Sequence, residues 1–170
     1  MGKASYVPKG DQFINMLAKG AEGEKAIIKK LRKITEVKDL TDYSKYQYYQ
    51  RKGLDFQFKS LKDPDVWLRG DSKANIRGGT AGNKGVTFFE MYNGTGKEGW
   101  FLTSKSDYIF IYDSEMGRSY FYDLDKMRDH ISNLSDSDYN KRLKRVRDGA
   151  YGIWWPVNHP LIVELDKYAA

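Results

Sequence analysis

Two aspartates and a lysine, Asp55, Asp71 and Lys73, are the residues whose types and spacing could carry out a reaction. Asp71 and Lys73 are separated by one residue, so on an extended strand their side chains project from the same face. Paired carboxylates bind hard divalent cations such as Mg²⁺ or Mn²⁺, and a neighbouring lysine can position water for attack on a phosphodiester. The same residue types also occur as ordinary charges on a solvated strand face, so their neighbours must decide between the two interpretations.

Two predicted strands, residues 54–59 and 66–75, would bring the acids together, with a turn at residues 62–65 between them. Alternation puts the apolar residues of the first strand on one face and Asp55 on the other. If the hairpin turns near the middle of that segment, Asp55 falls opposite residues 71–73. Two carboxylates this close repel each other, at roughly 0.2–1 kcal/mol for an exposed pair. A divalent cation would turn that repulsion into a binding site.

Glu24 adds a third acid to the predicted site. Residues 10–38 are predicted to be helical, in two pieces broken near Gly20 and Gly23, with apolar residues at helical spacing. Glu24 lies three and four residues before two isoleucines, which places it on or beside the apolar face that turns toward the sheet. A carboxylate there is costly unless it is paired or liganded. Glu24 therefore either supports a metal or water, or pairs with a basic side chain.

The net charge of +6 and the pI near 9.3 favour a polyanionic partner, for which DNA is the candidate. Basic residues also flank the acids in sequence, at Arg51, Lys52, Arg69, Arg77 and Lys84. An acidic site inside a positive field suits phosphodiester chemistry, because the surrounding cations hold the backbone phosphates. The residues expected to contact DNA are Arg77, Lys84, Lys105, Lys141 and Arg145. For the last two, the solvated face of a helix is the alternative.

The acidic residues and their neighbours resemble a known superfamily. Residues 50–55, followed by Asp71, Ser72 and Lys73, resemble the PD-(D/E)XK nucleases, which include restriction endonucleases and Holliday-junction resolvases. Glu24 is similar to the helix acid of resolvase-like members, and segments between residues 88 and 108 resemble small phage-type nucleases. The similarity covers residues 22–112. Leu54 stands where the motif name has proline, and Asp71 where glutamate is commoner, which leaves the subfamily open.

The resemblance implies a mixed β-sheet flanked by helices and an Mg²⁺- or Mn²⁺-dependent endonuclease that hydrolyses DNA, including branched or structured DNA. It implies Asp55, Asp71 and the backbone carbonyl of Ser72 as metal ligands, Lys73 as the catalytic lysine and Glu24 in support. A catalytically inactive DNA-binding or regulatory protein on the same scaffold is the alternative. Cleavage of opposing strands at a junction would call for a symmetric homodimer.

The rest of the chain predicts a single α/β (α+β) domain over residues 1–170, with a mixed central sheet. Further strands are predicted at residues 86–92, 108–112, 118–122 and 162–165, and a short helix or turn at 99–105. Helices at residues 125–133 and 136–147 would form a basic C-terminal helical region over about 125–148. Residues 42–50 and the glycine-rich residues 78–85 are predicted to be loops.

Composition and spacing argue against several other classes. With no cysteines, the chain has neither a disulfide framework nor a thiolate metal site. No apolar run approaches the roughly 18 residues of a membrane span, and residues 1–10 lack a secretory signal, so we expect a cytoplasmic protein. Residues 94–99 match the dinucleotide pattern G-x-G-x-x-G, but no long apolar helix follows to receive a pyrophosphate. Residues 136–147 lack the glycine and glutamate of a calcium loop.

Overall fold

The computed structural model describes residues 10–74, 85–146 and 149–169. Its first element is one continuous helix, α1 (Gly10–Leu31). The prediction of two pieces was therefore wrong, as was the predicted end at residue 38. Gly20 faces open space, with no neighbouring atom within 4 Å of where its Cβ would lie. A glycine inside a helix costs about 1 kcal/mol relative to alanine, and the packed turns that follow offset that cost.

Six strands form the larger sheet, in the order β1-β2-β3-β5-β6-β9. Neighbouring strands are antiparallel except β3 and β5, which run parallel, so the predicted mixed sheet is confirmed. The strands are β1 (Val37–Asp42), β2 (Phe56–Ser60), β3 (Asp63–Ala74), β5 (Tyr108–Asp113), β6 (Arg118–Asp123) and β9 (Val163–Glu164). β1 was not predicted. As an edge strand it is mostly exposed, and its residues do not alternate between buried and exposed positions.

A smaller sheet of three antiparallel strands, in the order β4-β8-β7, was not expected from the sequence. Its strands are β4 (Val86–Tyr92), β8 (Tyr151–Pro156) and β7 (Leu143–Arg145). The limits of β4 are those predicted. The basic helix predicted over residues 136–147 is wrong at residues 143–145, because these residues pair with β8 instead. This tertiary pairing outweighs the helical preference of lysine and arginine.

Short helices connect the strands: α2 (Gln47–Gln50), α3 (Trp100–Thr103), α4 (Leu124–Ser132), α5 (Asp136–Arg142) and the 3₁₀ helix η1 (Leu165–Lys167). Asp123 caps α4 by accepting the Lys126 N–H over 3.0 Å, and Ser135 caps α5 by accepting the Asp138 N–H over 3.1 Å. The predicted short helix within residues 99–105 and the helix near 125–133 are confirmed. None of the described helices is long and apolar enough to cross a membrane.

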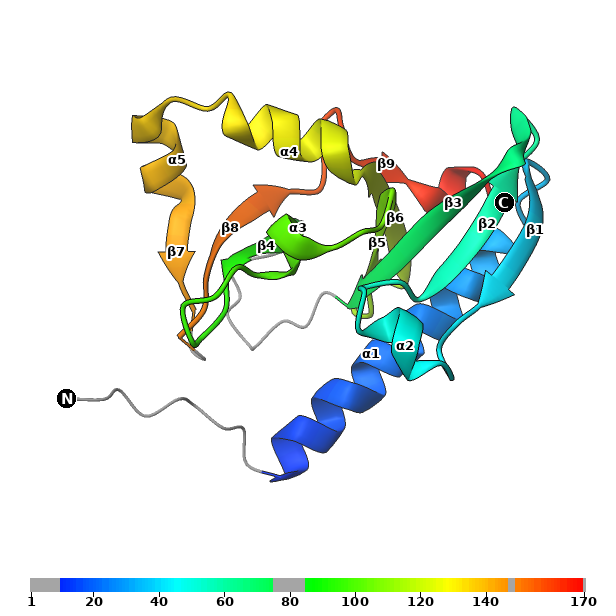
Figure 1. Cartoon of the computed structure of the whole chain (residues 1–170), viewed down its shortest axis with the longest axis horizontal. Coiled ribbons are helices and arrows are strands. Elements are labelled where there is room, and N and C mark those ends of the chain that lie inside the picture. Colours follow the sequence, from blue (N-terminus) through cyan, green and yellow to red (C-terminus); the bar gives the residue numbers. More distant parts are fainter. Residues whose placement is uncertain (1–9, 75–84, 147–148, 170) are drawn as a thin grey trace.

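Hydrophobic cores lie on both faces of the larger sheet. On one face α1 packs against β3 and β5, where Ile27, Leu31, Phe56 and Phe110 are buried. The opposite face carries a second cluster, shared by β5, β6, the smaller sheet and α4. Figure 1 shows α1 running along the larger sheet, while the smaller sheet, with α4 and α5, occupies the other end of the molecule. β5 is therefore packed on both sides, and β3 lies beside it with one face packed against α1.

Candidate active site

The hairpin of β2 and β3 places Asp55 beside Asp71. Phe56 of β2 pairs with Gly70 of β3, so the residue before Phe56 falls opposite the residue after Gly70. Two hydrogen bonds hold Asp55 there. Its N–H donates to the Gly70 carbonyl over 3.0 Å, and its Oδ2 accepts the Ser72 N–H over 2.7 Å. The hairpin register is the one expected from the sequence.

The turn that joins these strands differs from the one predicted. Ser60 pairs with Asp63, so the turn consists of residues 61 and 62 instead of 62–65. The register shifts between Phe58 and Ser60, which compensates for the different position of the turn. From Phe58 back to Phe56 the strands therefore pair in the predicted register. Gly70 permits the close packing here, because a Cβ at this position would lie 2.3 Å from the ring of Phe56.

Asp71 and Lys73 form an ion pair on the face of β3 that turns away from α1. Lys73 Nζ lies 2.9 Å from Oδ1 and 2.7 Å from Oδ2 of Asp71. The aspartate side chain is 2% exposed and that of the lysine 31%, so the ammonium group reaches solvent while the carboxylate does not. Lys73 Nζ also lies 5.2 Å from the ring centre of Trp100 in α3, a cation–π contact that restricts the lysine to the site.

Burial governs the protonation of Asp71. Desolvation raises the pKa of this carboxyl to about 7; the charge of Asp55 adds to the increase, and Lys73 opposes it. The free-energy cost of removing the charge from water is thus larger than the stabilisation that the ion pair with Lys73 provides. Near neutral pH such a carboxyl holds a proton or can exchange it for a cation.

Glu24 of α1 is a further acid, near enough to Asp55 for the two charges to interact. Its side chain is partly buried, and none of the residues that the structure describes donates a hydrogen bond to its buried Oε1. Burial first, and then the charges of Asp55 and Asp42, raise its pKa to about 7, while Lys25 has a smaller opposite effect. Glu24 therefore lies within electrostatic reach of Asp55, and the nearby charges with most effect on it are acidic.

The oxygen atoms of Asp55 and Asp71 fit a hard divalent cation. An all-oxygen donor set suits Mg²⁺ or Mn²⁺, and a cation would reduce the repulsion between the two carboxylates. Within the described ranges, no three Asp, Glu or His side chains converge closely enough to enclose a metal ion. A cation here would rest on the aspartate pair, with the Ser72 carbonyl as the predicted backbone ligand and water completing its shell, as is usual for Mg²⁺.

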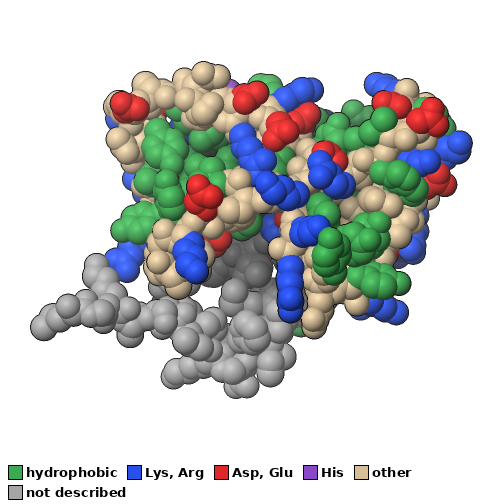
Figure 2. All heavy atoms as spheres, viewed as in Figure 1, with side chains coloured by type: hydrophobic (Ala, Val, Ile, Leu, Met, Phe, Trp, Pro, Cys, Tyr) green, Lys and Arg blue, Asp and Glu red, His purple; other side chains and the backbone are tan. Residues whose placement is uncertain are grey.

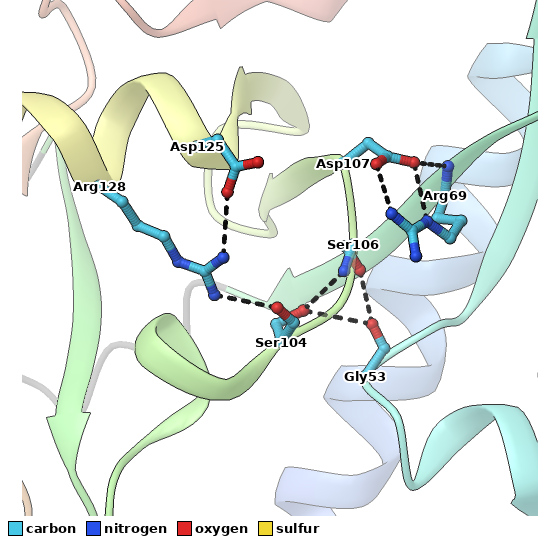
Figure 3. A network of polar contacts seen from close by, with 7 residues as sticks. All are labelled: Gly53, Arg69, Ser104, Ser106, Asp107, Asp125 and Arg128. Carbon is cyan, nitrogen blue, oxygen red and sulfur yellow. Dashed lines mark hydrogen bonds and ion pairs between the residues drawn. The ribbon is translucent and has the colours of Figure 1, made fainter.

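A network of polar contacts holds Gly53 against this pair (Figure 3). The Gly53 carbonyl accepts the Ser106 hydroxyl over 2.6 Å, and the Ser104 hydroxyl lies 3.5 Å away. Arg128 of α4 donates to the Ser104 carbonyl over 2.9 Å. Gly53 has φ +67°, and a Cβ on it would lie 3.1 Å from Ser104 Oγ and 3.5 Å from Asp71 Oδ2. Gly53 and the two serines were not predicted as positioning residues, because their contacts link segments far apart in the chain.

Arg69 does not belong to the basic surround predicted for the acids. Its guanidinium donates two hydrogen bonds to Asp107, of 3.0 and 2.7 Å, and its backbone N–H donates a third, of 2.7 Å (Figure 3). Burial raises the pKa of Asp107, but the hydrogen bonds from Arg69 outweigh it, and the pKa ends below its ordinary value. The pair ties β3 to the residue before β5, so the charge of Arg69 is already matched.

Of the other predicted DNA contacts, the structure describes Lys105, Lys141 and Arg145. Arg77 and Lys84 lie outside the described residues. Lys105 is exposed in the connection between α3 and β5, next to the serines that bind Gly53. Lys141 in α5 and Arg145 in β7 are exposed at the opposite end of the molecule from α2 (Figure 1). Lys and Arg side chains nevertheless gather over the middle of one face, between the two sheets (Figure 2).

Tyr122 is a polar neighbour of Asp71 that the sequence analysis did not single out. Asp71 pairs with Ile109, and Ile109 pairs with Tyr122, so the three side chains form a row on one face of the sheet. The Tyr122 hydroxyl is buried and has no hydrogen-bond partner among the described residues. Burial, with the charge of Asp71, raises the pKa of this phenol well above its ordinary value, so it stays neutral beside the carboxylate.

The G-x-G-x-x-G segment at residues 94–99 has no dinucleotide-binding geometry. Tyr92 bridges to Glu98, which closes the segment as a tight loop. The helix that follows, α3, has four residues and is too short to receive a pyrophosphate at its N-terminus. The prediction that no long helix follows this segment is confirmed.

Among solved structures, the chain is similar to that of a bacterial homing endonuclease, with a TM-score of 0.42 and 18% sequence identity. The match covers 79% of this chain and 87% of the other. At this identity the likeness is one of fold alone. No protein-family model and no curated protein matches the sequence.

Proposed function

We propose that this protein is a metal-dependent endonuclease that hydrolyses phosphodiester bonds in DNA. The observation that carries the proposal is the meeting of Asp55 and Asp71 beside Lys73, with Glu24 close by. Strongly shifted pKa values and crowded carboxylates concentrate at functional sites, and this arrangement leaves an excess of negative charge for a cation to neutralise. The net charge of +6 supports a polyanionic substrate.

The residues of the site would divide the work of hydrolysis. A water oxygen attacks phosphorus, the bond to the leaving oxygen breaks, and a proton passes from the attacking water to the leaving oxygen through the surrounding solvent. Ser72 orients Asp55 and Lys73 orients Asp71, so both carboxylates are fixed before substrate arrives. The ammonium group of Lys73 can orient the attacking water or donate a hydrogen bond to the phosphate. When bound, a divalent cation would stabilise the charge that develops on the phosphate.

A cleavage panel tests this function directly. Linear, nicked, flapped and four-way DNA would be incubated with Mg²⁺ or Mn²⁺, using wild-type protein and Lys73→Ala. We expect divalent-dependent cleavage by the wild type alone, and a preference for branched or structured substrates. Calorimetric titration with Mn²⁺ provides a readout independent of cleavage. If Asp71→Asn bound Mn²⁺ as tightly as the wild type, the proposed metal site would be wrong.

A second candidate is a DNA-binding protein without catalytic activity on the same scaffold. The observation in its favour is that Lys73 contacts both oxygens of Asp71, which partly balances the buried charge without a metal. This candidate predicts duplex binding with no cleavage at any divalent concentration. It also predicts that Lys73→Ala leaves DNA binding unchanged.

A further inference from the structure

Four tyrosines form a compact aromatic group around α2, called here the tyrosine cluster: Tyr43, Tyr46, Tyr48 and Tyr49. The rings of Tyr43 and Tyr49 stack 4.0 Å apart at an interplanar angle of 13°. Tyr46 meets both of them edge-to-face at 6.4 Å, and Tyr48 meets Tyr49 edge-to-face at 5.2 Å. The inner pair thereby supports the two outer rings.

The outer rings of the tyrosine cluster face solvent. Tyr46 is 59% exposed and Tyr48 is 64% exposed, and α2 buries none of its own residues. Figure 2 shows a hydrophobic patch where Figure 1 places α2, with Lys and Arg side chains around it. The two rings therefore do not anchor α2 in the core, and their exposed faces remain available to a ligand.

The charges around the tyrosine cluster are positive. Residues 43–54 contain Lys45, Arg51 and Lys52 and no acid, and all three cations are exposed. The preceding acid, Asp42, accepts the Ser44 N–H over 2.8 Å, so part of its carboxylate is already engaged. Lys52 Nζ lies 4.2 Å from the ring centre of Tyr48 and donates to its hydroxyl over 2.6 Å. Exposed aromatic rings among cations are typical of surfaces that bind single-stranded nucleic acid.

Backbone hydrogen bonds attach the tyrosine cluster to the acidic site. The Tyr43 N–H donates to the Asp55 carbonyl over 2.7 Å, and the Leu54 N–H donates to the Tyr49 carbonyl over 3.1 Å. Gly53, which passes next to Asp71, joins α2 to this part of the chain. A DNA strand bound at the aspartates would therefore lie next to the segment that carries Tyr46 and Tyr48.

We propose that Tyr46 and Tyr48 stack against unpaired bases of a DNA strand whose backbone crosses Asp55 and Asp71. The inference rests on the nuclease function proposed above and assigns its substrate class: DNA with unpaired nucleotides beside the scissile phosphate. In an intact duplex the base faces are already stacked on each other, so a blunt duplex offers these rings no partner. Lys45, Arg51 and Lys52 would hold the phosphates of the same unpaired strand.

The test measures binding and stacking without cleavage. In EDTA, fluorescence anisotropy would compare oligothymidylate, a duplex with an unpaired overhang and the blunt duplex. We expect Tyr46→Ser/Tyr48→Ser to bind the unpaired strands at least about tenfold more weakly and the blunt duplex unchanged, since the variant lacks both rings on which bases would stack. A 2-aminopurine in the overhang should lose fluorescence on binding to the wild type and not to this variant. Tyr46→Phe/Tyr48→Phe should bind as the wild type, because it keeps the rings.

Tyr168→Ser is the matched control, because Tyr168 is 51% exposed and lies outside the tyrosine cluster. Thermal unfolding would verify that each variant folds. Equal binding of unpaired strands by the wild type and the serine variant would overturn the proposal. It would also be overturned if the serine variant lost as much affinity for the blunt duplex as for the unpaired strands, because that result would indicate backbone contact or a different partner. If stacking depends on the tyrosines but no DNA is ever cut, the tyrosine cluster keeps its assignment and the nuclease function fails. If the serine variant cleaves DNA as the wild type does, the nuclease function stands and the tyrosine cluster loses its assignment.

Discussion

Lys73 Nζ contacts both carboxylate oxygens of Asp71, at 2.9 and 2.7 Å, yet the pKa of this carboxyl is raised to about 7. A paired aspartate usually has a lowered pKa, because the neighbouring cation favours its charged form. Here burial and the charge of Asp55 outweigh the lysine. Even with this ion pair, the ionised form of Asp71 is destabilised relative to an aspartate in water. A cation bound between the two aspartates would stabilise that ionised form.

The first prediction concerns stability against pH. Folding raises the pKa values of Asp71 and Glu24 from 3.8 and 4.5 to about 7, so the native state binds more protons than the unfolded state between those limits. The free energy of unfolding should therefore fall as pH rises from about 4 to about 7 and level off above that. Urea titrations in EDTA across this range would measure it. Added Mn²⁺ should reduce the loss at the upper end, because it binds the ionised carboxylates.

Asp107, whose pKa is lowered, has the opposite effect, because it contributes stability that is lost as the pH falls toward and below its ordinary pKa. The relevant quantity is therefore the difference between the wild type and Asp71→Asn at each pH. A difference that does not change from pH about 4 to about 7 would contradict the raised pKa of Asp71.

The second prediction is that Asp71→Asn stabilises the protein while removing its metal affinity. Asparagine keeps the shape of the side chain and removes a buried charge, and Lys73 is exposed enough to be solvated alone. We expect the free energy of unfolding at pH about 8 to rise by about 1–3 kcal/mol in EDTA. Denaturation and Mn²⁺ calorimetry on the same samples would check both parts. A destabilised variant that still binds Mn²⁺ would show that Asp71 serves the fold and not a metal.

The sequence predicted the register of the β2–β3 hairpin, but it did not predict every strand around that hairpin. Alternation along two strands is a local property, and it sufficed to place Asp55 opposite Asp71. β8 was missed, although it carries aromatic residues, because its strand character depends on pairing with β4 and β7, which are distant in sequence. The break assigned at Gly20 and Gly23 was wrong for a similar reason: the packing of Ile27 and Leu31 on the sheet stabilises the helix more than the glycines weaken it.

The third prediction separates catalysis from folding at Lys73. Lys73→Ala removes the group that would orient water or contact the phosphate, and we expect cleavage to fall at least about 100-fold. Lys62→Ala is the matched control, because Lys62 is an exposed lysine in the turn of the same hairpin. Steady-state cleavage rates and thermal melting of both variants would be compared. Full activity in Lys73→Ala would remove the lysine from the mechanism and favour the DNA-binding candidate.

The fourth prediction uses two glycines that share a backbone conformation and differ in their surroundings. Gly53 and Gly96 have φ of +67° and +82°, so alanine should cost about 1–2 kcal/mol of stability at either position. A Cβ at Gly96 would meet nothing within 4 Å, whereas one at Gly53 would lie 3.1 Å from Ser104 Oγ and 3.5 Å from Asp71 Oδ2. Gly53→Ala should therefore displace the loop that packs on the aspartates and lower both Mn²⁺ affinity and cleavage. Gly96→Ala should lose stability alone. Equal activity in the two folded variants would mean that the contact between Gly53 and Asp71 does not position the site.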